Sequence, residues 1–491
     1  YTMNQLVLPI DLEVSLQEND IAFHIHHLVE SIPKEAFRPF FKNNGCPAYD
    51  PRMMLKIILC GYTQSAFSGR KIEALLHDSL RMMWLAQQQK PSYRTINRFR
   101  VNPHVQELLR QCFVQFRSHL VKEKMIKEEA IFIDGTKIEA NANKFSFVWK
   151  RSVDRYQKSL IEKSNELYEE LLQEQIIPEI ARESSEELST KELETIAEKV
   201  NDVVVDYTNQ IDQSEDVEKR KQLRSERKYP KQVYKKMIDM IRRKKNYHKH
   251  QQIFKQRNSY SKTDHDATFM RMKDDYMRNG QLKAGYNVQV ATEGQYALAY
   301  DIFPNPTDTR TLIPFLETIK KNFFELPPYI VADAGYGSEL NYNEVLMTYK
   351  RVPLITYGSY RKEQKRSFKK DLFNKANWPY DIEHDYYTCP NGQKLFFSFL
   401  SKRKDSYGFQ RNFKVYECES CDSCPLRSSC TKAKEGNNRK IYVNETWEQQ
   451  KEYIKELLSE DQINAIYKQR KVDVEPFFGF LKANLSFNRF S

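Results

Sequence analysis

Two aspartates directly follow apolar runs, at positions where a protein can hold catalytic metal ions. Asp134 follows residues 130–133 and precedes Gly135, and Asp333 follows residues 329–332. Apolar runs of this length, rich in Ile and Val, are typical of strands buried on both faces. Open α/β sheets place their chemistry where such strands end. Asp-Gly alone is an ordinary turn pair, so the catalytic interpretation of Asp134 depends on partners elsewhere in the chain.

A third carboxylate stands late in the chain, among basic and aromatic residues. Glu475 is our candidate, and Asp473, two residues earlier, is a competitor that periodicity alone does not exclude. Carboxylates are hard oxygen donors suited to Mg²⁺ or Mn²⁺. Two such ions about 3.5–4 Å apart activate an attacking oxygen and stabilise the leaving one in phosphoryl transfer. The pattern predicts a site for two divalent ions at Asp134, Asp333 and Glu475.

Five of the eight cysteines fall in one late stretch, and the other three are scattered. Four thiolates suit a closed, structural zinc site, and the predicted ligands are Cys389, Cys421, Cys424 and Cys430. Cys418 forms a second Cys-x-x-Cys pair with Cys421, so it is an alternative ligand. Reduced thiols without metal, or a redox use, are the other interpretations. The scattered cysteines, Cys46, Cys60 and Cys112, favour a reducing, cytoplasmic compartment over a disulfide framework.

Composition favours a nucleic-acid partner. The 491 residues predict two to four domains with room for a large core. The formal net charge is +12, without an amphipathic anchor, which favours a polyanion over a membrane; a merely basic, soluble surface is the alternative. The sequence contains no run of eighteen apolar residues, so no transmembrane helix is expected. Its first residues do not have the pattern of a signal peptide.

The elements before the first aspartate are predicted to be helices. Asp50 and Pro51 have the N-cap and first-turn signature of a helix start. A second helix is expected near residues 68–70, and a third, with arginines on one side, at residues 93–100. Such an arrangement resembles a helix-turn-helix, and a plain helical bundle with a solvated basic face is the alternative.

Residues 150–260 are long, charged and free of glycine, and they have helical periodicity. Their first part is acidic and their second part is basic. Helices that are polar nearly all round project from domains or bridge them, and blocks of like charge often mark interaction segments. We therefore predict an inserted helical arm whose basic half contacts phosphates, which position a protein without specifying sequence.

Strand periodicity returns at residue 284. Residues 284–290 and 297–302 predict a hairpin, a helix is expected from Asp308, and further strands are expected at 329–332 and 352–357. Residues 358–440 leave this pattern, and residues 445–485 predict one long helix. The predicted fold class is multidomain α/β, with a mixed sheet flanked by helices.

Several blocks carry a family resemblance: residues 49–51 to 95–100, 134–137, 262–267 with 270–273, 285–289, 333–336, and 475–479 with Lys482. They resemble bacterial insertion-sequence transposases of the DDE superfamily, in the branch with a cysteine-rich insertion before the catalytic glutamate. The resemblance implies a ribonuclease H-like core built from residues 126–150, 261–358 and 441–491. It also implies a helical DNA-binding and dimerisation domain (1–125), a charged helical insertion (151–260) and a zinc-bound insertion (359–440).

The resemblance implies a role for each acid. Asp134 and Asp333 would hold both Mg²⁺ or Mn²⁺ ions, and Glu475 would complete the second site. DNA strands would be hydrolysed, and the freed 3′-hydroxyls would be joined to target DNA. Asp264, Asp266 and Asp308 are not expected to be ligands; turn-forming, helix-capping or supporting roles are expected instead.

The resemblance implies double-stranded DNA as the partner, both as element ends and as target. A homodimer is expected on the DNA. The expected location is the bacterial cytoplasm, in association with the nucleoid. The expected DNA contacts are Arg98, Arg100, Arg242, Arg243, Lys244, Lys245, Tyr467, Arg470, Lys471 and Lys482. Glu475 lies one place further from Arg470 than the family pattern, and Lys471 is an alternative basic partner. Family chains continue past this helix, so a shortened chain is expected. Two alternative functions are considered: a nuclease on the same core, and a DNA-binding protein without strand transfer.

Overall fold

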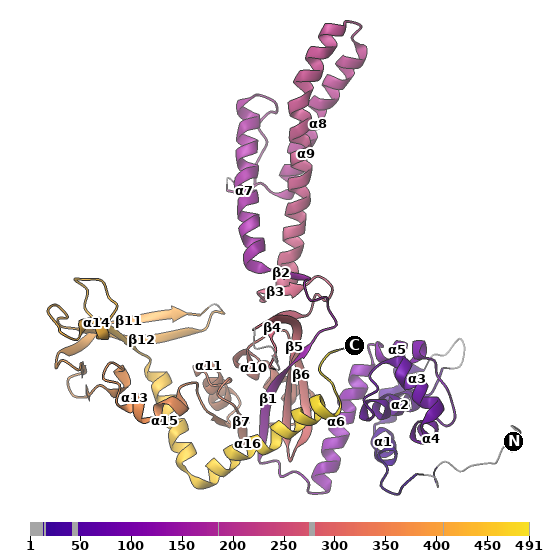
Figure 1. The fold of residues 1–491 in the computed structure, drawn as a ribbon, viewed down its shortest axis with the longest axis vertical. Helices are drawn as coiled ribbons and strands as arrows, with labels where there is room; N and C mark the ends of the chain where they lie inside the picture. The colour runs from indigo at the N-terminus through magenta and orange to yellow at the C-terminus, as the bar shows by residue number, and fades with distance from the viewer. Residues whose placement is uncertain are drawn as a thin grey trace, which may run out of the picture. The chain divides into compact units, whose positions relative to one another are not determined.

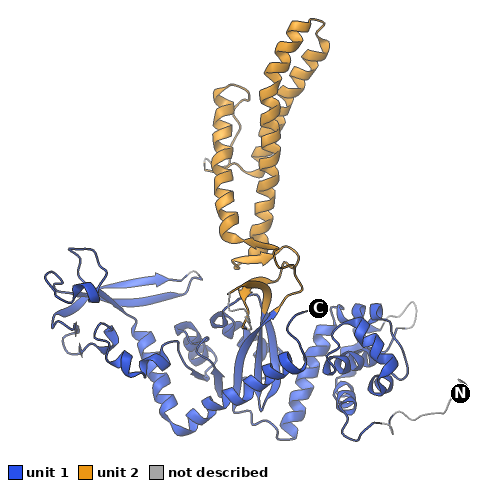
Figure 2. Ribbon diagram, viewed as in Figure 1, with its two compact units in different colours: residues 1–138, 287–491 blue, residues 139–286 orange. Residues whose placement is uncertain are grey.

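The computed structural model describes residues 13, 16–41, 48–184, 186–273, 280–405 and 407–490; Cys46 and Ser491 lie outside them. The chain forms two compact units (Figure 2), one of residues 1–138 with 287–491 and one of residues 139–286. Among the described residues, no helix has the length and apolar character needed to cross a membrane.

The N-terminal segment of the first unit is helical, as predicted. Asp50 caps one helix by accepting a hydrogen bond from the Arg52 amide at 2.7 Å, and Ser68 caps the next through the Lys71 amide at 3.3 Å. The helices share one core, in which Ile57, Ile72 and Ile96 are fully buried. They are α1 (Ile21–Glu30), η1 (Lys34–Phe40), α2 (Pro51–Thr63), α3 (Gly69–Asp78), α4 (Leu80–Leu85), α5 (Tyr93–Arg100) and α6 (Val105–Lys122).

A mixed sheet forms the centre of the first unit (Figure 1). Its strand order is β6-β5-β1-β7-β8, in which β7 runs parallel to β1 and β8, and β5 and β6 form an antiparallel hairpin. The first part of β5 belongs to the second unit, where it pairs with β4 (Thr268–Arg271). The strands are β1 (Ala130–Glu139), β5 (Leu282–Glu293), β6 (Tyr296–Phe303), β7 (Tyr329–Ala332) and β8 (Val352–Ile355). The predicted strands and hairpin are confirmed.

Helices cover both faces of this sheet. On the face of Ile131 and Ile133 pack α10 (Leu312–Asn322) and α15 (Glu445–Ser459). On the opposite face, α16 (Asp461–Gly479) places Val474 against Phe132. Short turns of helix follow β7, namely α11 (Glu339–Asn343) and η3 (Glu344–Thr348).

The prediction of one long helix over residues 445–485 was wrong. The chain breaks at Glu460, which has an extended backbone with φ −75° and ψ 123°. The reason is packing, because α15 and α16 bury their apolar residues on opposite faces of the sheet. One straight helix cannot reach both faces. A π-helical turn, η5 (Phe480–Asn484), then continues from α16.

The second unit contains the predicted helical arm (Figure 2). Its helices are α7 (Lys150–Gln173), α8 (Thr190–Gln213) and α9 (Val217–Phe254), and they share buried apolar residues such as Leu171, Val200 and Met237. Ser189 and Glu192 form a capping box at the start of α8. The strand β2 (Phe147–Trp149) precedes α7 and the strand β3 (Ser259–Ser261) follows α9, and the two strands pair at the base of the arm.

The cysteine-rich segment of the first unit forms an antiparallel sheet, which the sequence pattern had not indicated. Its order is β13-β12-β11-β10-β9, and its small core contains Trp378, Leu395 and Tyr416. Its elements are α12 (Tyr360–Glu363), α13 (Arg366–Lys369), η4 (Lys375–Asn377), β9 (Tyr380–Asp381), β10 (Tyr386–Thr388), β11 (Lys394–Lys404), β12 (Gln410–Cys418), α14 (Arg427–Cys430) and β13 (Lys440–Val443).

Candidate active site

The register of two parallel strands places two of the predicted acids side by side. Ile133 of β1 pairs with Ala332 of β7, so the next residues, Asp134 and Asp333, end up as neighbours where the pairing stops. Adjacent strands lie about 4.8 Å apart. Asp333 closes a turn after β7, where the Gly335 N–H donates to its Oδ1 at 2.8 Å. The prediction that the first strand ends at Asp134 was wrong, because β1 continues to Glu139; inside this strand the Gly135 N–H donates to Asp134 Oδ1 at 2.7 Å.

A third aspartate joins this edge of the sheet, and it was not expected to be a metal ligand. Asp308 Oδ1 accepts hydrogen bonds from Asn287 Nδ2 at 2.8 Å and from Gln289 Nε2 at 3.1 Å. Both amides are fully buried on β5. Asp308 opens the short helix η2 (Asp308–Arg310) without a side-chain capping bond. Of the roles that the sequence left open, support of the site agrees with these contacts and capping does not.

Tyr336 connects the three aspartates electrostatically. Its fully buried hydroxyl donates to Gln289 Oε1 at 2.5 Å. Burial raises the pKa of Tyr336 far above its ordinary value, and the charges of Asp308, Asp134 and Asp333 raise it further. The geometry brings two of these carboxylates together, since a Cβ on Gly335 would lie 2.9 Å from Asp333 Oδ1 and 3.8 Å from Asp308 Oδ2. Mutually close carboxylates repel one another unless a cation offsets their charge.

Gly135 is required by this close packing. A Cβ at that position would lie 2.1 Å from Gln289 Nε2 and 2.9 Å from both Asn287 Oδ1 and Asp308 Oδ1. The glycine therefore lets the first strand approach the buried amides that hold Asp308. The Asp-Gly pair has a packing reason here besides its turn propensity.

The helix α16 brings basic and aromatic groups to the same edge. Arg470 Nη1 lies 3.8 Å from Asp134 Oδ2, with both side chains mostly buried. One helical turn earlier, the Tyr467 hydroxyl lies 3.1 Å from Thr356 Oγ1, just beyond β8. Among the predicted DNA contacts of this region, Lys471 is exposed and Lys482 is partly exposed.

The two candidate third acids occupy different environments. Asp473 is 2% exposed, and its Oδ1 accepts the Gln295 N–H at 2.6 Å, in the turn between β5 and β6. Burial raises its pKa. Its neighbour Glu293 accepts the amide of Lys127 at 2.6 Å, before β1 begins, so Asp473 lies away from the end of the strands. Glu475 is exposed, and in the described residues no three His, Cys, Asp or Glu side chains are grouped as metal ligands.

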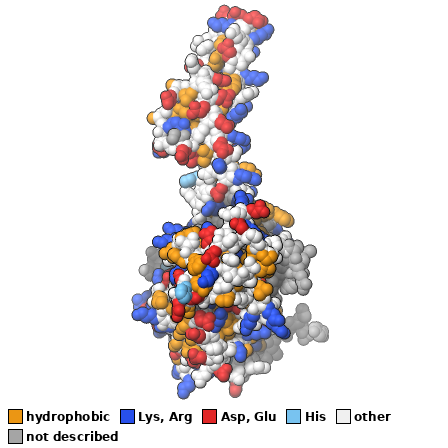
Figure 3. Space-filling view, turned by 90° about the vertical axis from the view of Figure 1, so that its left-hand side faces the viewer, with side chains coloured by type: hydrophobic (Ala, Val, Ile, Leu, Met, Phe, Trp, Pro, Cys, Tyr) orange, Lys and Arg blue, Asp and Glu red, His pale blue; other side chains and the backbone are white. Residues whose placement is uncertain are grey.

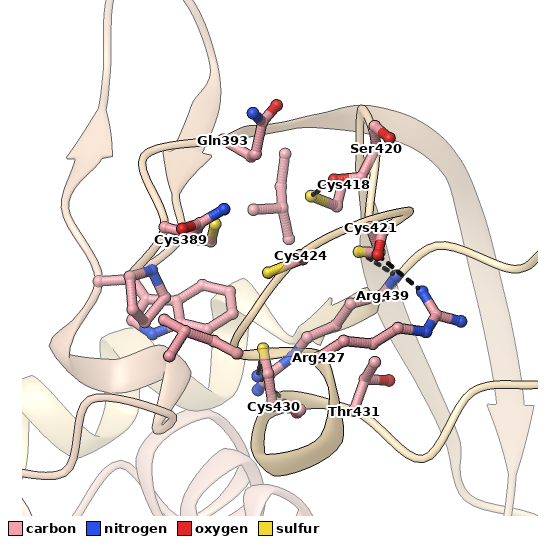
Figure 4. A pocket seen from close by; sticks show the side chains of 15 residues that line it. Cys389, Gln393, Cys418, Ser420, Cys421, Cys424, Arg427, Cys430, Thr431 and Arg439 are labelled. Atoms are coloured by element: carbon pink, nitrogen blue, oxygen red, sulfur yellow. Dashed lines mark hydrogen bonds between the residues drawn. The ribbon is translucent and has the colours of Figure 1, made fainter. Parts of the chain in front are cut away.

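Five cysteines line one pocket in the cysteine-rich segment (Figure 4): Cys389, Cys418, Cys421, Cys424 and Cys430. Arg439 is adjacent to two of them, since its amide donates to Cys421 Sγ at 3.3 Å and its Nη1 lies 2.7 Å from Cys430 Sγ. The Cys418 thiol instead donates to the carbonyl of Ser420 at 3.5 Å. The residue types suit zinc, but the described sulfur atoms are not grouped at metal-ligand spacing, so this arrangement gives the zinc prediction no support.

The hairpin of β11 and β12 extends from this pocket to the acidic edge. The Arg310 guanidinium lies over the ring of Tyr407, near the hairpin tip. Arg411 Nε lies 3.5 Å from Glu339 Oε2. Arg310 is two residues after Asp308, and Glu339 is six residues after Asp333. The cysteine-rich segment therefore packs against the loops that carry two of the three aspartates.

The remaining predicted DNA contacts differ in how free they are. Arg98 is exposed on α5, whereas Arg100 donates to the carbonyl of Phe67 at 2.9 Å and is partly buried. The basic run at residues 242–245 is engaged within the arm. Its ion pairs are Arg242 and Arg243 with Asp239, Lys244 with Glu187, and Lys245 with Glu194, at 2.5, 2.6, 2.8 and 2.6 Å.

The rejected aspartate Asp264 is occupied elsewhere. Both of its carboxylate oxygens accept from the Tyr286 hydroxyl at 2.9 Å, and its Oδ1 also lies 3.3 Å from the Asp266 amide. A turn-forming role for Asp264, as predicted, agrees with these contacts.

Comparison with known families bears on the two ends of the chain. The family model described as Transposase DDE domain matches residues 388–491, and the one described as Transposase domain (DUF772) matches residues 10–102. Neither the curated proteins nor the solved structures gave a match. One transposase domain model thus matches the N-terminal helices and another matches the segment from β10 through α16, and together they support an insertion-sequence DDE transposase.

Proposed function

We propose that this protein is a DNA transposase that cuts at the ends of its element and joins the freed ends to target DNA. The observation that carries the proposal is the strand register that makes Asp134 and Asp333 neighbours, in a chain matched by transposase domains at both ends. The sheet order β6-β5-β1-β7-β8 also agrees with a ribonuclease H-like core.

The acidic edge fits divalent metal ions in its donor chemistry. Asp134, Asp333 and Asp308 supply hard carboxylate oxygens, and Arg470 forms an ion pair with Asp134. Asp134 and Asp333 would hold the ions, and Glu475 of α16 would complete the set. When bound, Mg²⁺ or Mn²⁺ would lower the pKa of an attacking hydroxyl or water and offset charge on the leaving oxygen.

The residues of the chain would do the remaining work by positioning. In the first step, water attacks a phosphodiester and the bond to the 3′ oxygen breaks, which leaves a 3′-hydroxyl. In the second step, that hydroxyl attacks a target phosphodiester, and one phosphodiester is exchanged for another without an external energy source. Arg470 and Lys471 of α16 would bind phosphate oxygens beside the acids. Asn287 and Gln289 would fix Asp308 so that its charge lies next to Asp333.

DNA binding and self-association complete the proposal. The helical segment that contains Arg98 would bind element ends, and two copies would act together because two ends must be joined. We further propose that Cys389, Cys421, Cys424 and Cys430 bind one structural zinc ion, with Cys418 left as a buried thiol. Such a zinc site would fix the base of the β11–β12 hairpin, whose tip contacts Arg310 beside the acidic edge.

The test is incubation of the purified protein with labelled candidate element ends, target DNA and Mg²⁺. Cut strands together with joined products are the expected result. Cut strands without joined products would favour the nuclease alternative, and binding without cutting would favour a DNA-binding protein.

A further inference from the structure

One face of α9 carries a line of basic residues that shares only Arg242 with the run at 242–245. We call it the basic stripe: Arg224, Lys228, Lys231, Lys235, Arg242 and Lys249. Successive members are four, three, four, seven and seven residues apart, so they share one face of the helix. All six are exposed, while Leu223, Val233 and Met237 are buried on the other face. At about 1.5 Å per residue, the 25 residues from Arg224 to Lys249 extend over about 37 Å.

The acidic residues of the arm leave this stripe largely uncompensated. Within the described part of the arm, Arg242 is the stripe member with an ion pair, to Asp239 at 2.5 Å. The acids of the preceding segment instead pair with the adjacent run, as Glu187 does with Lys244 and Glu194 with Lys245. The run that is prominent in the sequence is thus partly neutralised, and the free positive charge lies on the stripe.

This geometry fits duplex DNA better than a membrane surface. Like charges fixed along one helix face repel one another, and a polyanion offsets that repulsion. A 37 Å line corresponds to about eleven base pairs at 3.4 Å each, which is about one turn of the duplex. A membrane-binding helix needs a broad apolar face beside its cations, whereas the exposed large apolar residues of α9 are Val217 and Ile238, which lie far apart along the helix. In Figure 3, Lys and Arg side chains recur along one edge of the arm.

We propose that the basic stripe of α9 binds the phosphate backbone of duplex DNA and contributes affinity without sequence preference. The inference rests on the proposed function in taking DNA as the partner. It goes beyond that function by assigning DNA binding to one face of α9, in the second unit, whereas the sequence predicted phosphate contacts for the basic half of the arm as a whole and listed only the run at residues 242–245.

The test uses the full chain and the salt dependence of its binding to a duplex of about 40 base pairs. The variant Lys228→Gln/Lys231→Gln/Lys235→Gln removes three charges from the stripe. The control Lys158→Gln/Lys163→Gln/Lys191→Gln removes three exposed charges from α7 and α8 of the same arm. Counterion release changes the slope of log affinity against log salt by about 0.9 per phosphate contact. The stripe variant should lose about two to three units of slope, and the control should keep the wild-type slope.

Two results would overturn the inference: an unchanged slope in the stripe variant, or an equal loss in the control. Sedimentation without DNA covers a second possibility. If the stripe variant changes the mass of the particle while its DNA slope stays unchanged, the stripe binds another copy of the chain instead. Cleavage of saturating DNA at low salt separates this inference from the proposed function. Absence of cleavage by the wild-type protein would contradict the proposed transposase function. The role of the stripe is decided only by the slope of log affinity against log salt.

Discussion

The guanidinium of Arg470 lies 3.8 Å from the carboxylate of Asp134. The two residues are separated by most of the chain, and between them come the helical arm and the cysteine-rich sheet. Their ion pair fixes α16 over the middle of β1, at the point where the pairing of β1 with β7 stops and Asp333 is the neighbour of Asp134. The acidic edge of the sheet is therefore the place where the last long helix, the first strand and the β11–β12 hairpin meet.

The two acids of α16 are expected to respond differently to neutral substitution. Glu475→Gln should reduce Mg²⁺-dependent cleavage by at least about a hundredfold, because it removes a proposed metal ligand. Asp473→Asn keeps an acceptor for the Gln295 amide and should leave cleavage within a few-fold of wild type. Single-turnover cleavage of a labelled element end measures both. Loss of activity in Asp473→Asn with full activity in Glu475→Gln would reverse the assignment.

Asp308 is expected to act through its charge. Asp308→Asn keeps the Oδ1 acceptor for Asn287 and Gln289 but removes the negative charge. A group that supports metal ligands typically contributes 10–100-fold in affinity or activity, so cleavage should fall by about that factor and need more Mg²⁺. The control is Asp264→Asn, whose parent carboxylate is bound by Tyr286. An Mg²⁺ titration in which Asp308→Asn matches the wild type would exclude Asp308 from the site.

The cysteine pocket is expected to bind about one zinc ion per chain. Elemental analysis of purified protein should find it, and Cys421→Ser/Cys424→Ser should lose it together with thermal stability of the β11–β12 hairpin. Cys60→Ser, in the N-terminal helices, is the matched control and should keep the metal. Zinc-free protein with wild-type stability would remove the zinc proposal but leave the acidic edge untouched.

Sequence patterns predicted both buried strands and the place of Asp333 directly after β7, because a buried strand that ends in a polar residue has a local signature. They did not predict that β1 continues past Asp134 to Glu139. The confirmed hairpin, the cap Asp50 and the helix start near residues 68–70 are local in the same sense. What failed depended on contacts far apart in the chain. The break at Glu460 follows from burial on two faces of one sheet, and no residue near it marks a stop.

The support for Asp308 was equally hidden. Asn287 and Gln289 belong to an alternating strand, and only the fold shows that their amides reach a carboxylate some twenty residues later. The basic run of the arm looked free because its acidic partners, such as Glu187 for Lys244, lie in a preceding segment. Charge in a sequence gives the sign of a segment, and the fold determines which charges remain uncompensated.

The most direct test of the account compares binding and cleavage in Asp134→Asn and Asp333→Asn. Both substitutions keep the side-chain size and remove one charge from the acidic edge. With labelled element ends and Mg²⁺, we expect normal end binding, and cleavage and joining lowered by at least about a thousandfold in each variant. Cleavage at the wild-type rate in either variant would contradict the central claim that these neighbouring aspartates form the active site.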